Sequence, residues 1–279
     1  MQLTTRAPAR PFARLRHVLL TPRAARVTAP LLFLVAWQLV APLIPSRILP
    51  MPADVVEAML GQARDGTLVG AFSVSLRRLL VGFLLALGIG GVLGLAMGLS
   101  SRIEALLHDF VIVGLTFPYL IWGLLVAMWF GFEGQGPVIV VFIAAMPYVM
   151  LNAAEGVRDV SKELRDMASA YEVPGPRVVR HLILPSLSPF LFASLRYGLA
   201  NGWKGLVLAE VFAATSGAGY HINEMREYGD FAGVVGFAVY FAIFSIVVER
   251  LLFGRLSRWV FRWRQSTVRA ESEPLETTQ

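Results

Sequence analysis

Few side chains in this sequence could do chemistry within its apolar segments, and four of them fall in one stretch. These are Arg196, Trp203, Lys204 and Glu210, within the mostly apolar residues 189–212. On a helix, Arg196, Trp203 and Glu210 would lie near one line, and Lys204 about 80° around from Arg196. Arg196 and Glu210 would be roughly 21 Å apart along the axis, too far to pair directly. An ionisable side chain in an apolar segment usually faces a protein interior or an aqueous cavity.

Enzymatic and metal chemistry find little support elsewhere in the chain. A nucleotide-binding P-loop needs a lysine directly after glycine, but the two lysines are Lys162, after Ser161, and Lys204, after Trp203. There is no cysteine, which excludes disulfides, thiol nucleophiles and cysteine metal ligands. The four histidines lie far apart, and no pair has the spacing of a helical zinc site; they are His17, His108, His181 and His221. We therefore expect no catalytic residue, no metal site and no cofactor bound by this chain.

The composition predicts an all-α polytopic membrane protein. Of the 279 residues 56% are hydrophobic and 16% charged, and the mean hydropathy is +0.62, which is too apolar for an ordinary soluble domain. Stretches of about 17 to 25 apolar residues can span the roughly 30 Å hydrocarbon core. Six such spans are predicted: approximately Thr28–Ile44, Val74–Leu99, Phe110–Phe130, Pro137–Leu151, Pro189–Phe212 and Phe231–Leu251.

Proline and glycine add detail to these spans. Phe117-Pro118 and Met146-Pro147 could kink the third and fourth spans. Gly90, Gly94 and Gly98 form a series of small residues four apart in the second span, a pattern that permits close helix approach, with a hinge as the alternative.

Basic residues predict the orientation. Most of the 25 Lys and Arg residues lie in the N-terminal arm (residues 1–27), in the insert 159–185, or from Arg250 onward, and cytoplasmic loops retain positive charge. Both termini and the insert are therefore expected in the cytoplasm, with a transmembrane domain over residues 28–264 and a polar tail over 265–279. Arg77 and Arg78 are a local exception that could snorkel to lipid head groups. Because the basic residues flank apolar runs and do not interleave with aromatics, we expect the lipid bilayer, and no nucleic acid, as a partner.

The insert is amphipathic and predicts a docking surface. Val160, Leu164, Met167, Ala168 and Tyr171 would form one stripe on a helix, with Ser161 or Asp159 as its cap. Residues 174–176, Pro-Gly-Pro, predict a sharp break, and a second short helix would follow and end before Pro185. The stripe could lie on the lipid surface, or it could be an apolar ridge presented to a groove on another protein.

At this point the sequence resembles a family. Permease subunits of bacterial binding-protein-dependent ABC importers carry a cytoplasmic loop with an E-A-A triplet, a glycine and an I-x-L-P end. Anchoring on Leu184-Pro185 puts Asp166-Met167-Ala168 at the triplet, Glu172 at the glycine and Leu182 at the isoleucine. Further segments agree in order and spacing with the nitrate, sulfonate and taurine type of permease: Ser75-Leu76-Arg77-Arg78, Phe117-Pro118, Trp129-Phe130-Gly131, Leu208-Ala209-Glu210 and Gly217-Ala218-Gly219-Tyr220.

The resemblance implies contact with a cytoplasmic ATPase through the insert. The implied coupling residues are Asp166, Met167, Ala168, Tyr171, Glu172, Gly175, Leu182, Leu184 and Pro185. The family glycine would allow a positive φ at the turn, where a glutamate is strained. We expect Gly175, within Pro174-Gly175-Pro176, to supply that turn instead, and the partner ATPase to be matched to an acidic residue at position 172.

The implied assembly contains a second, probably identical, copy of this chain, two ATPase subunits that use ATP, and an extracytoplasmic solute-binding protein in the bacterial inner membrane. Within it, Arg196, Trp203, Lys204 and Glu210 are candidates to line the translocation path for an organic anion such as a sulfonate, or for nitrate. The same four residues could instead snorkel, pair with another span or hold the dimer. Two alternatives stay open: a stand-alone secondary carrier or channel, and an importer of a neutral or cationic vitamin precursor.

Overall fold

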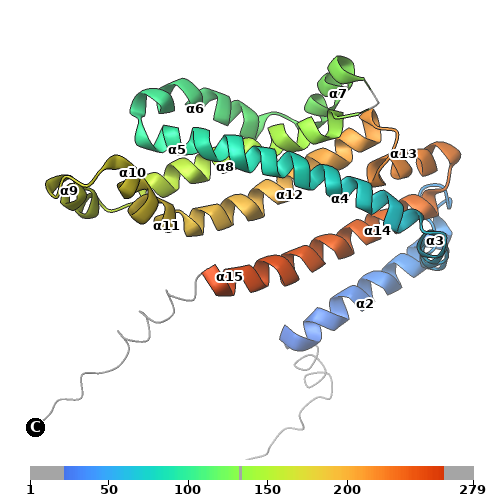
Figure 1. Cartoon of the computed structure of the whole chain (residues 1–279). Coiled ribbons are helices and arrows are strands. Elements are labelled where there is room, and N and C mark those ends of the chain that lie inside the picture. The colour runs from blue at the N-terminus through green and yellow to red at the C-terminus, as the bar shows by residue number, and fades with distance from the viewer. Residues whose placement is uncertain (1–21, 132–133, 261–279) are drawn as a thin grey trace, which may run out of the picture.

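The computed structural model describes residues 22–131 and 134–260, and all regular structure in these ranges is helical (Figure 1). The predicted all-α fold is therefore confirmed. Of the predicted N-terminal arm only residues 22–27 are described, and they form the start of the first helix. The rest of the arm and the predicted tail, 265–279, lie outside the described residues.

The elements follow one another with short connections. The first half contains α2 (Pro22–Val40), η1 (Ala41–Leu43), α3 (Pro52–Arg64), α4 (Thr67–Leu85), η2 (Ala86–Gly90), α5 (Gly91–Leu99), α6 (Ser101–Thr116) and α7 (Tyr119–Phe130). The second half contains α8 (Gly136–Arg158), α9 (Lys162–Ala170), α10 (Gly175–Val178), η3 (Val179–Ile183), α11 (Leu184–Ser186), α12 (Ser188–Ala213), α13 (Ala218–Tyr228), α14 (Phe231–Val247), η4 (Val248–Phe253) and α15 (Gly254–Val260). Here η1 is a 3₁₀ turn, and η2, η3 and η4 are π-helical turns.

Three helical stretches in the described part of the chain are long and apolar enough to cross a membrane: Thr67–Leu99, Gly136–Arg158 and Phe231–Ser257. Two more crossings arise if each of two bent helix pairs counts as one span, and Thr28–Leu43 is a shorter apolar helix. These six segments occupy the positions of the six predicted spans. The second span is longer than predicted because its helix begins earlier, at Thr67, and the fourth is longer because its helix continues to Arg158.

The third span is not the single helix that its composition predicts. Between α6 and α7 the chain turns by 101° at Phe117-Pro118. Both residues are extended, with ψ of 132° and 128°. Proline disfavours helical geometry at the residue before it and cannot donate a backbone hydrogen bond, so this Pro118 ends the helix where only a kink was expected. Pro147, by contrast, lies inside the continuous helix α8.

Helix α8 is the centre of the bundle. It packs against α12 on one side and against α4, η2 and α5 on another, and it is the most buried of the three long spans. A Cβ added at Gly94 would lie 2.5 Å from the carbonyl oxygen of Met150, and one at Gly98 would lie 2.5 Å from Cβ of Val157. The predicted packing role of this glycine series is therefore confirmed, because only glycine lets the two backbones come this close.

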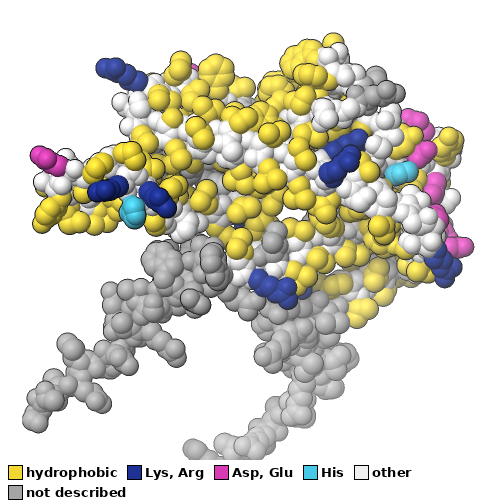
Figure 2. All heavy atoms as spheres, in the orientation of Figure 1, with side chains coloured by type: hydrophobic (Ala, Val, Ile, Leu, Met, Phe, Trp, Pro, Cys, Tyr) yellow, Lys and Arg dark blue, Asp and Glu magenta, His cyan; other side chains and the backbone are white. Residues whose placement is uncertain are grey.

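The two ends of the bundle differ. Figure 1 shows α9, α10 and α11 at one end of α8 and α12, and α3 and α13 at the other. Between these ends, apolar side chains cover most of the face seen in Figure 2, and acidic side chains gather mainly toward the α3 and α13 end. Exposed leucine, isoleucine, valine and phenylalanine side chains occur throughout α2, α4, α5 and α14. This distribution is expected for helices that face lipid.

Candidate functional site

Helix α9 is held to the end of α8 by specific hydrogen bonds. The Ser161 hydroxyl accepts from the N–H of Leu164 at 3.4 Å, so the predicted Ser161 cap is confirmed. Arg165 Nη2 donates to the carbonyl oxygen of Val160 at 2.8 Å. Such contacts satisfy backbone groups that the helix ends leave unpaired. They fix where α9 leaves α8.

One flank of α9 is an exposed apolar ridge, which we define as Leu164, Met167 and Tyr171. Their exposed fractions are 43%, 54% and 79%, and no residue of α9 is buried. Figure 1 shows α9 as the outermost element at its end of the bundle. Val160 was predicted to join this stripe, but it precedes the helix and is buried, because it packs with Val157 at the junction. The ridge is thus shorter than predicted.

The turn after α9 is made by Glu172, and the prediction that Gly175 supplies it is wrong. Glu172 has φ of 52° and is the one described non-glycine residue with positive φ. The N–H of Glu172 donates to the carbonyl of Ser169 (3.0 Å), and that of Val173 to the carbonyl of Ala168 (2.9 Å). These two bonds form the Schellman cap, which requires a left-handed residue at this position. Gly175 instead begins the next helix.

The second arm of the hairpin returns to the bundle through α10, η3 and α11. Ile183 and Leu187 are buried against Val157 and Val160, with Leu182 partly buried beside them. The arm was predicted to end before Pro185, but helical structure continues to Ser186. Pro185 lies in the first turn of α11, after a π turn, where its missing N–H has little cost. The apolar contacts on the return arm make the hairpin one unit with α8.

The nine predicted coupling residues all lie in this hairpin. Asp166, Met167 and Ala168 are in α9; Tyr171 and Glu172 are in the turn; Gly175 begins α10; Leu182 is in η3; and Leu184 and Pro185 are in α11. A further link was not predicted: Arg158 at the end of α8 pairs with Glu104 in the first turn of α6 at 2.6 Å. Both side chains are partly exposed, so the pair adds at most about 1 kcal/mol.

Glu210 lies in a buried network and has no exposed surface. Its carboxylate accepts from Ser75 Oγ at 2.7 Å, from Arg78 Nη1 at 2.9 Å and from the N–H of Gly219 at 3.0 Å. Arg78, for which snorkelling was one possibility, thus turns inward and joins α4 to α12 and to the α12–α13 connection. Sequence reasoning found Ser75 and Arg78 only as part of a family motif and could not assign their partner.

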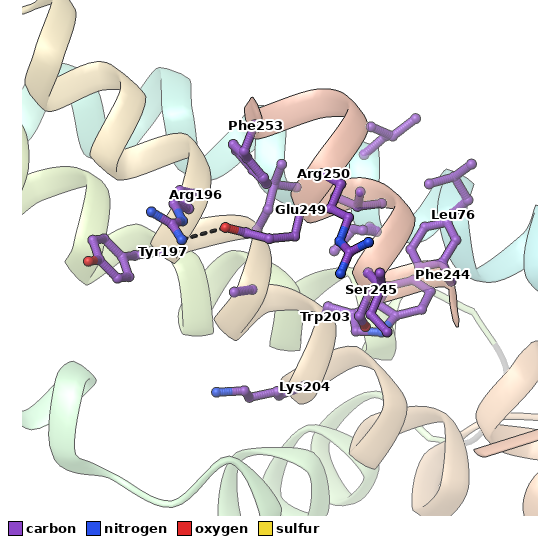
Figure 3. Close-up of a pocket in the computed structure, with 16 residues that line it drawn as sticks. Leu76, Arg196, Tyr197, Trp203, Lys204, Phe244, Ser245, Glu249, Arg250 and Phe253 are labelled. Carbon is purple, nitrogen blue, oxygen red and sulfur yellow. Dashed lines mark hydrogen bonds and ion pairs between the residues drawn. The ribbon is translucent and has the colours of Figure 1, made fainter. Parts of the chain in front are cut away.

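Arg196 pairs with Glu249 of η4, and both side chains are about half exposed. Trp203 lies against Phe244, with ring centroids 4.8 Å apart, and against Phe241 at 5.1 Å. A mostly apolar pocket of about 630 Å³ lies between α4, α12 and the end of α14 (Figure 3), and it is lined by Arg196, Trp203, Phe244 and Glu249 and also by Lys204. For Arg196, the structure therefore confirms the alternative in which the side chain pairs with another span.

Lys204 differs from the other three residues. It is exposed, and no ion pair between described side chains includes it. Figure 3 shows its side chain pointing away from Trp203 and from the Arg196–Glu249 pair. One turn away on α12, Asn201 Oδ1 accepts from the hydroxyl of Tyr119 at 3.0 Å. A cation in the middle of a 26-residue apolar helix, next to polar side chains, is the arrangement expected beside an aqueous cavity.

Comparisons with known proteins agree with these features. Residues 86–262 match the family described as "Binding-protein-dependent transport system inner membrane component". The chain is 30% identical over 236 residues to the putative aliphatic sulfonates transport permease protein SsuC of Bacillus subtilis, covering 82% of this chain and 85% of that protein. It is 30% identical to the taurine transport system permease protein TauC of Escherichia coli, covering 80% and 82%. It is 27% identical to the nitrate import permease protein NrtB of Synechococcus elongatus, covering 94% and 98%.

Proposed function

Because the chain belongs to the family of binding-protein-dependent transport system inner membrane components, we propose that it imports a small anion and docks an ATPase on α9. It is a multi-pass permease of the membrane, and the family argues against a stand-alone secondary carrier. In this proposal ATP is hydrolysed by a separate cytoplasmic subunit, and an extracytoplasmic protein delivers the solute. Two copies of this chain enclose the path.

The observation that carries the docking proposal is the exposed ridge of α9. Leu164, Met167 and Tyr171 present exposed apolar surface on a short helix, none of whose residues is buried in the described part of the protomer. An amphipathic helix of this kind binds by laying its apolar face in a groove. The Schellman cap and the return arm hold α9 at a fixed angle to α8. Movement of the ATPase would therefore be passed to α8 and α12 as a rigid-body motion.

Co-purification tests the docking. The chain is expressed with its cognate ABC ATPase, and Leu164→Asp is compared with Ser169→Asp, a change on the opposite face of the same helix. Because both positions are exposed, neither change should unfold the chain. We expect Leu164→Asp to lower the recovered ATPase at least tenfold and Ser169→Asp to leave it within twofold. Equal recovery in the two variants would contradict docking through the ridge.

The proposed substrate class is an organic or inorganic monoanion. The relatives above are described as permeases for sulfonates, taurine and nitrate. Of the four candidate path residues, Arg196 and Glu210 have their charges compensated by Glu249 and Arg78. That leaves the Lys204 ammonium as the cation that could attract an anion in the path.

Uptake assays test the substrate class. Cells that express the whole transporter are given labelled ethanesulfonate or nitrate, with thiamine as a cationic comparison. One charge-assisted contact of roughly 1.4 kcal/mol corresponds to a factor of ten, so Lys204→Gln should lower anion uptake about tenfold. Arg196→Gln serves as the matched control and should change uptake less. Uptake of thiamine alone would refute the anion proposal and favour a vitamin-type substrate.

The orientation is part of the proposal, with both termini and the hairpin in the cytoplasm. The absence of native cysteine makes a single introduced cysteine unique. A membrane-impermeant maleimide should label Met167→Cys only in inside-out vesicles and Arg64→Cys only in intact spheroplasts. The reverse pattern would show the opposite topology, in which α9 lies outside the cytoplasm and cannot contact the ATPase.

A further inference from the structure

A second pocket, which is polar, lies at the end of α8 that is remote from the hairpin. It has a volume of about 680 Å³, and it is lined by Arg77, Arg78, Gln135, Thr215 and Ser216 together with one glycine and two valines. Most residues that line the pocket beside Trp203 are apolar, whereas five of the eight that line this one carry guanidinium, amide or hydroxyl groups. It is formed by α4, the residues that lead into α8, and the connection between α12 and α13. None of the candidate path residues lines it.

The two arginines of this pocket have different surroundings. Arg78 is fully engaged in structure: Nη1 donates to Glu210 and to the carbonyl of Ser216 (2.6 Å), and Nη2 donates to the Ser216 hydroxyl (2.9 Å). Its charge is compensated by Glu210 at 2.9 Å. Arg77 is exposed, and its side chain makes no hydrogen bond or ion pair with another described residue. Among the described side chains that line the pocket, the Arg77 guanidinium is therefore a positive charge without a compensating carboxylate.

The backbone adds to this positive potential. Helix α8 begins at Gly136, and its N-cap, Gln135, makes no capping hydrogen bond through its side chain. The first turn of a helix has unpaired N–H groups and the positive end of the helix dipole. Val138, in this first turn, also lines the pocket. This helix end meets a guanidinium group and hydroxyl groups in one cavity.

We propose that this pocket binds a small oxyanion, such as a sulfonate or nitrate, before the anion enters the path. A guanidinium group matches the planar pair of oxygen atoms that sulfonate and nitrate present. Thr215, Ser216 and Gln135 supply hydrogen-bond donors for the remaining oxygen. No described carboxylate pairs with Arg77, so a bound anion would compensate its charge. Arg78 is the positioning residue, because its bonds to Ser216 and Glu210 hold the α12–α13 connection beside α4.

The side of the membrane that this pocket faces rests on the proposed function. Helix α8 has 23 residues, so its two ends are about 34 Å apart. If the hairpin at Arg158 faces the cytoplasm, the pocket at Gly136 faces the compartment from which the binding protein delivers its solute. The pocket would then raise the local anion concentration at the outer mouth of the transporter.

Direct binding to the full chain in lipid nanodiscs tests the inference. Methanesulfonate is titrated by calorimetry, with dimethyl sulfone, its neutral analogue, as the comparison ligand. We expect methanesulfonate to bind and dimethyl sulfone not to bind, and Arg77→Gln to raise the dissociation constant at least tenfold. Arg77→Lys, which keeps the charge, should recover part of the affinity. Arg102→Gln, an exposed arginine near the hairpin end, is the matched control and should stay within twofold of the unmodified chain.

Equal affinities in Arg77→Gln and Arg102→Gln, or equal binding of the neutral sulfone, would overturn the proposal. This measurement needs neither the ATPase nor the binding protein. Arg77-dependent binding combined with failed ATPase co-purification would reject the proposed docking while the anion pocket stands. ATPase co-purification without Arg77-dependent binding would reject the pocket alone.

Discussion

Replacing Glu172 with glycine should stabilise the C-terminal cap of α9. Glu172 has φ of 52° in the Schellman cap, and a left-handed conformation costs an L-residue roughly 1–2 kcal/mol. Glycine avoids this cost but loses about 0.5–1 kcal/mol more backbone entropy on folding. The net gain expected for Glu172→Gly is therefore about 0.5–1 kcal/mol. Local opening of the cap should become two- to fivefold rarer, since roughly 1 kcal/mol is a factor of five.

Hydrogen–deuterium exchange by mass spectrometry measures this effect at the N–H groups of Glu172 and Val173, which form the cap bonds. Glu163→Gly makes the same change in the first turn of α9 and should lower protection of the helix about threefold, because glycine is roughly 0.7 kcal/mol worse than glutamate there. Opposite signs in the two variants are the predicted result. Unchanged or weaker protection in Glu172→Gly would show that the positive φ of Glu172 does not strain the cap. If the ATPase is matched to an acidic residue here, its co-purification with Glu172→Gly should not become tighter.

Two further predictions concern the stability of the bundle, measured by thermal unfolding of the purified chain. A Cβ at Gly94 would lie 2.5 Å from a carbonyl oxygen of α8, whereas one at Gly91 would meet nothing within 4 Å. Gly94→Ala should therefore lower the free energy of unfolding by about 1–3 kcal/mol. Gly91→Ala should leave it unchanged or raise it slightly. Similar melting temperatures for the two would contradict the close α5–α8 contact. Glu210→Gln should cost roughly 3–5 kcal/mol because it leaves Arg78 without its buried partner, and Glu249→Gln should cost under about 1 kcal/mol because its pair is exposed. An equal loss of unfolding free energy in both variants would show that burial does not determine how much each ion pair stabilises the fold.

Periodicity and composition predict most of the membrane domain. Long apolar runs locate the spans because each must satisfy its backbone internally and exceed the hydrocarbon thickness. The glycine series predicts the α5–α8 contact, since it is a local pattern on one helix face. The Ser161 cap is predictable for the same reason: the hydroxyl and the N–H of Leu164 are three residues apart.

Other features depend on contacts that no local pattern contains. Ser75 and Arg78 meet Glu210 across more than 130 residues of sequence, so their inward orientation could not be predicted from α4 alone. The 101° turn at Phe117-Pro118 has a local signal, but a proline predicts a kink and a full break equally well. The strained φ of Glu172 is stabilised by two cap bonds that outweigh glutamate's preference for a right-handed conformation.

If the ridge of α9 contacts the ATPase, site-specific cross-linking will join the two proteins through that ridge. The chain has no cysteine, so Met167→Cys and Ser169→Cys each introduce a single attachment point for a photoactivated maleimide, on the ridge and on the opposite face of α9. The assembled transporter is irradiated, and the products are identified by mass spectrometry. The predicted result is a covalent product between position 167 and the ATPase, with little product from position 169. Equal products from both positions, or a product from position 167 with lipid alone, would contradict that contact.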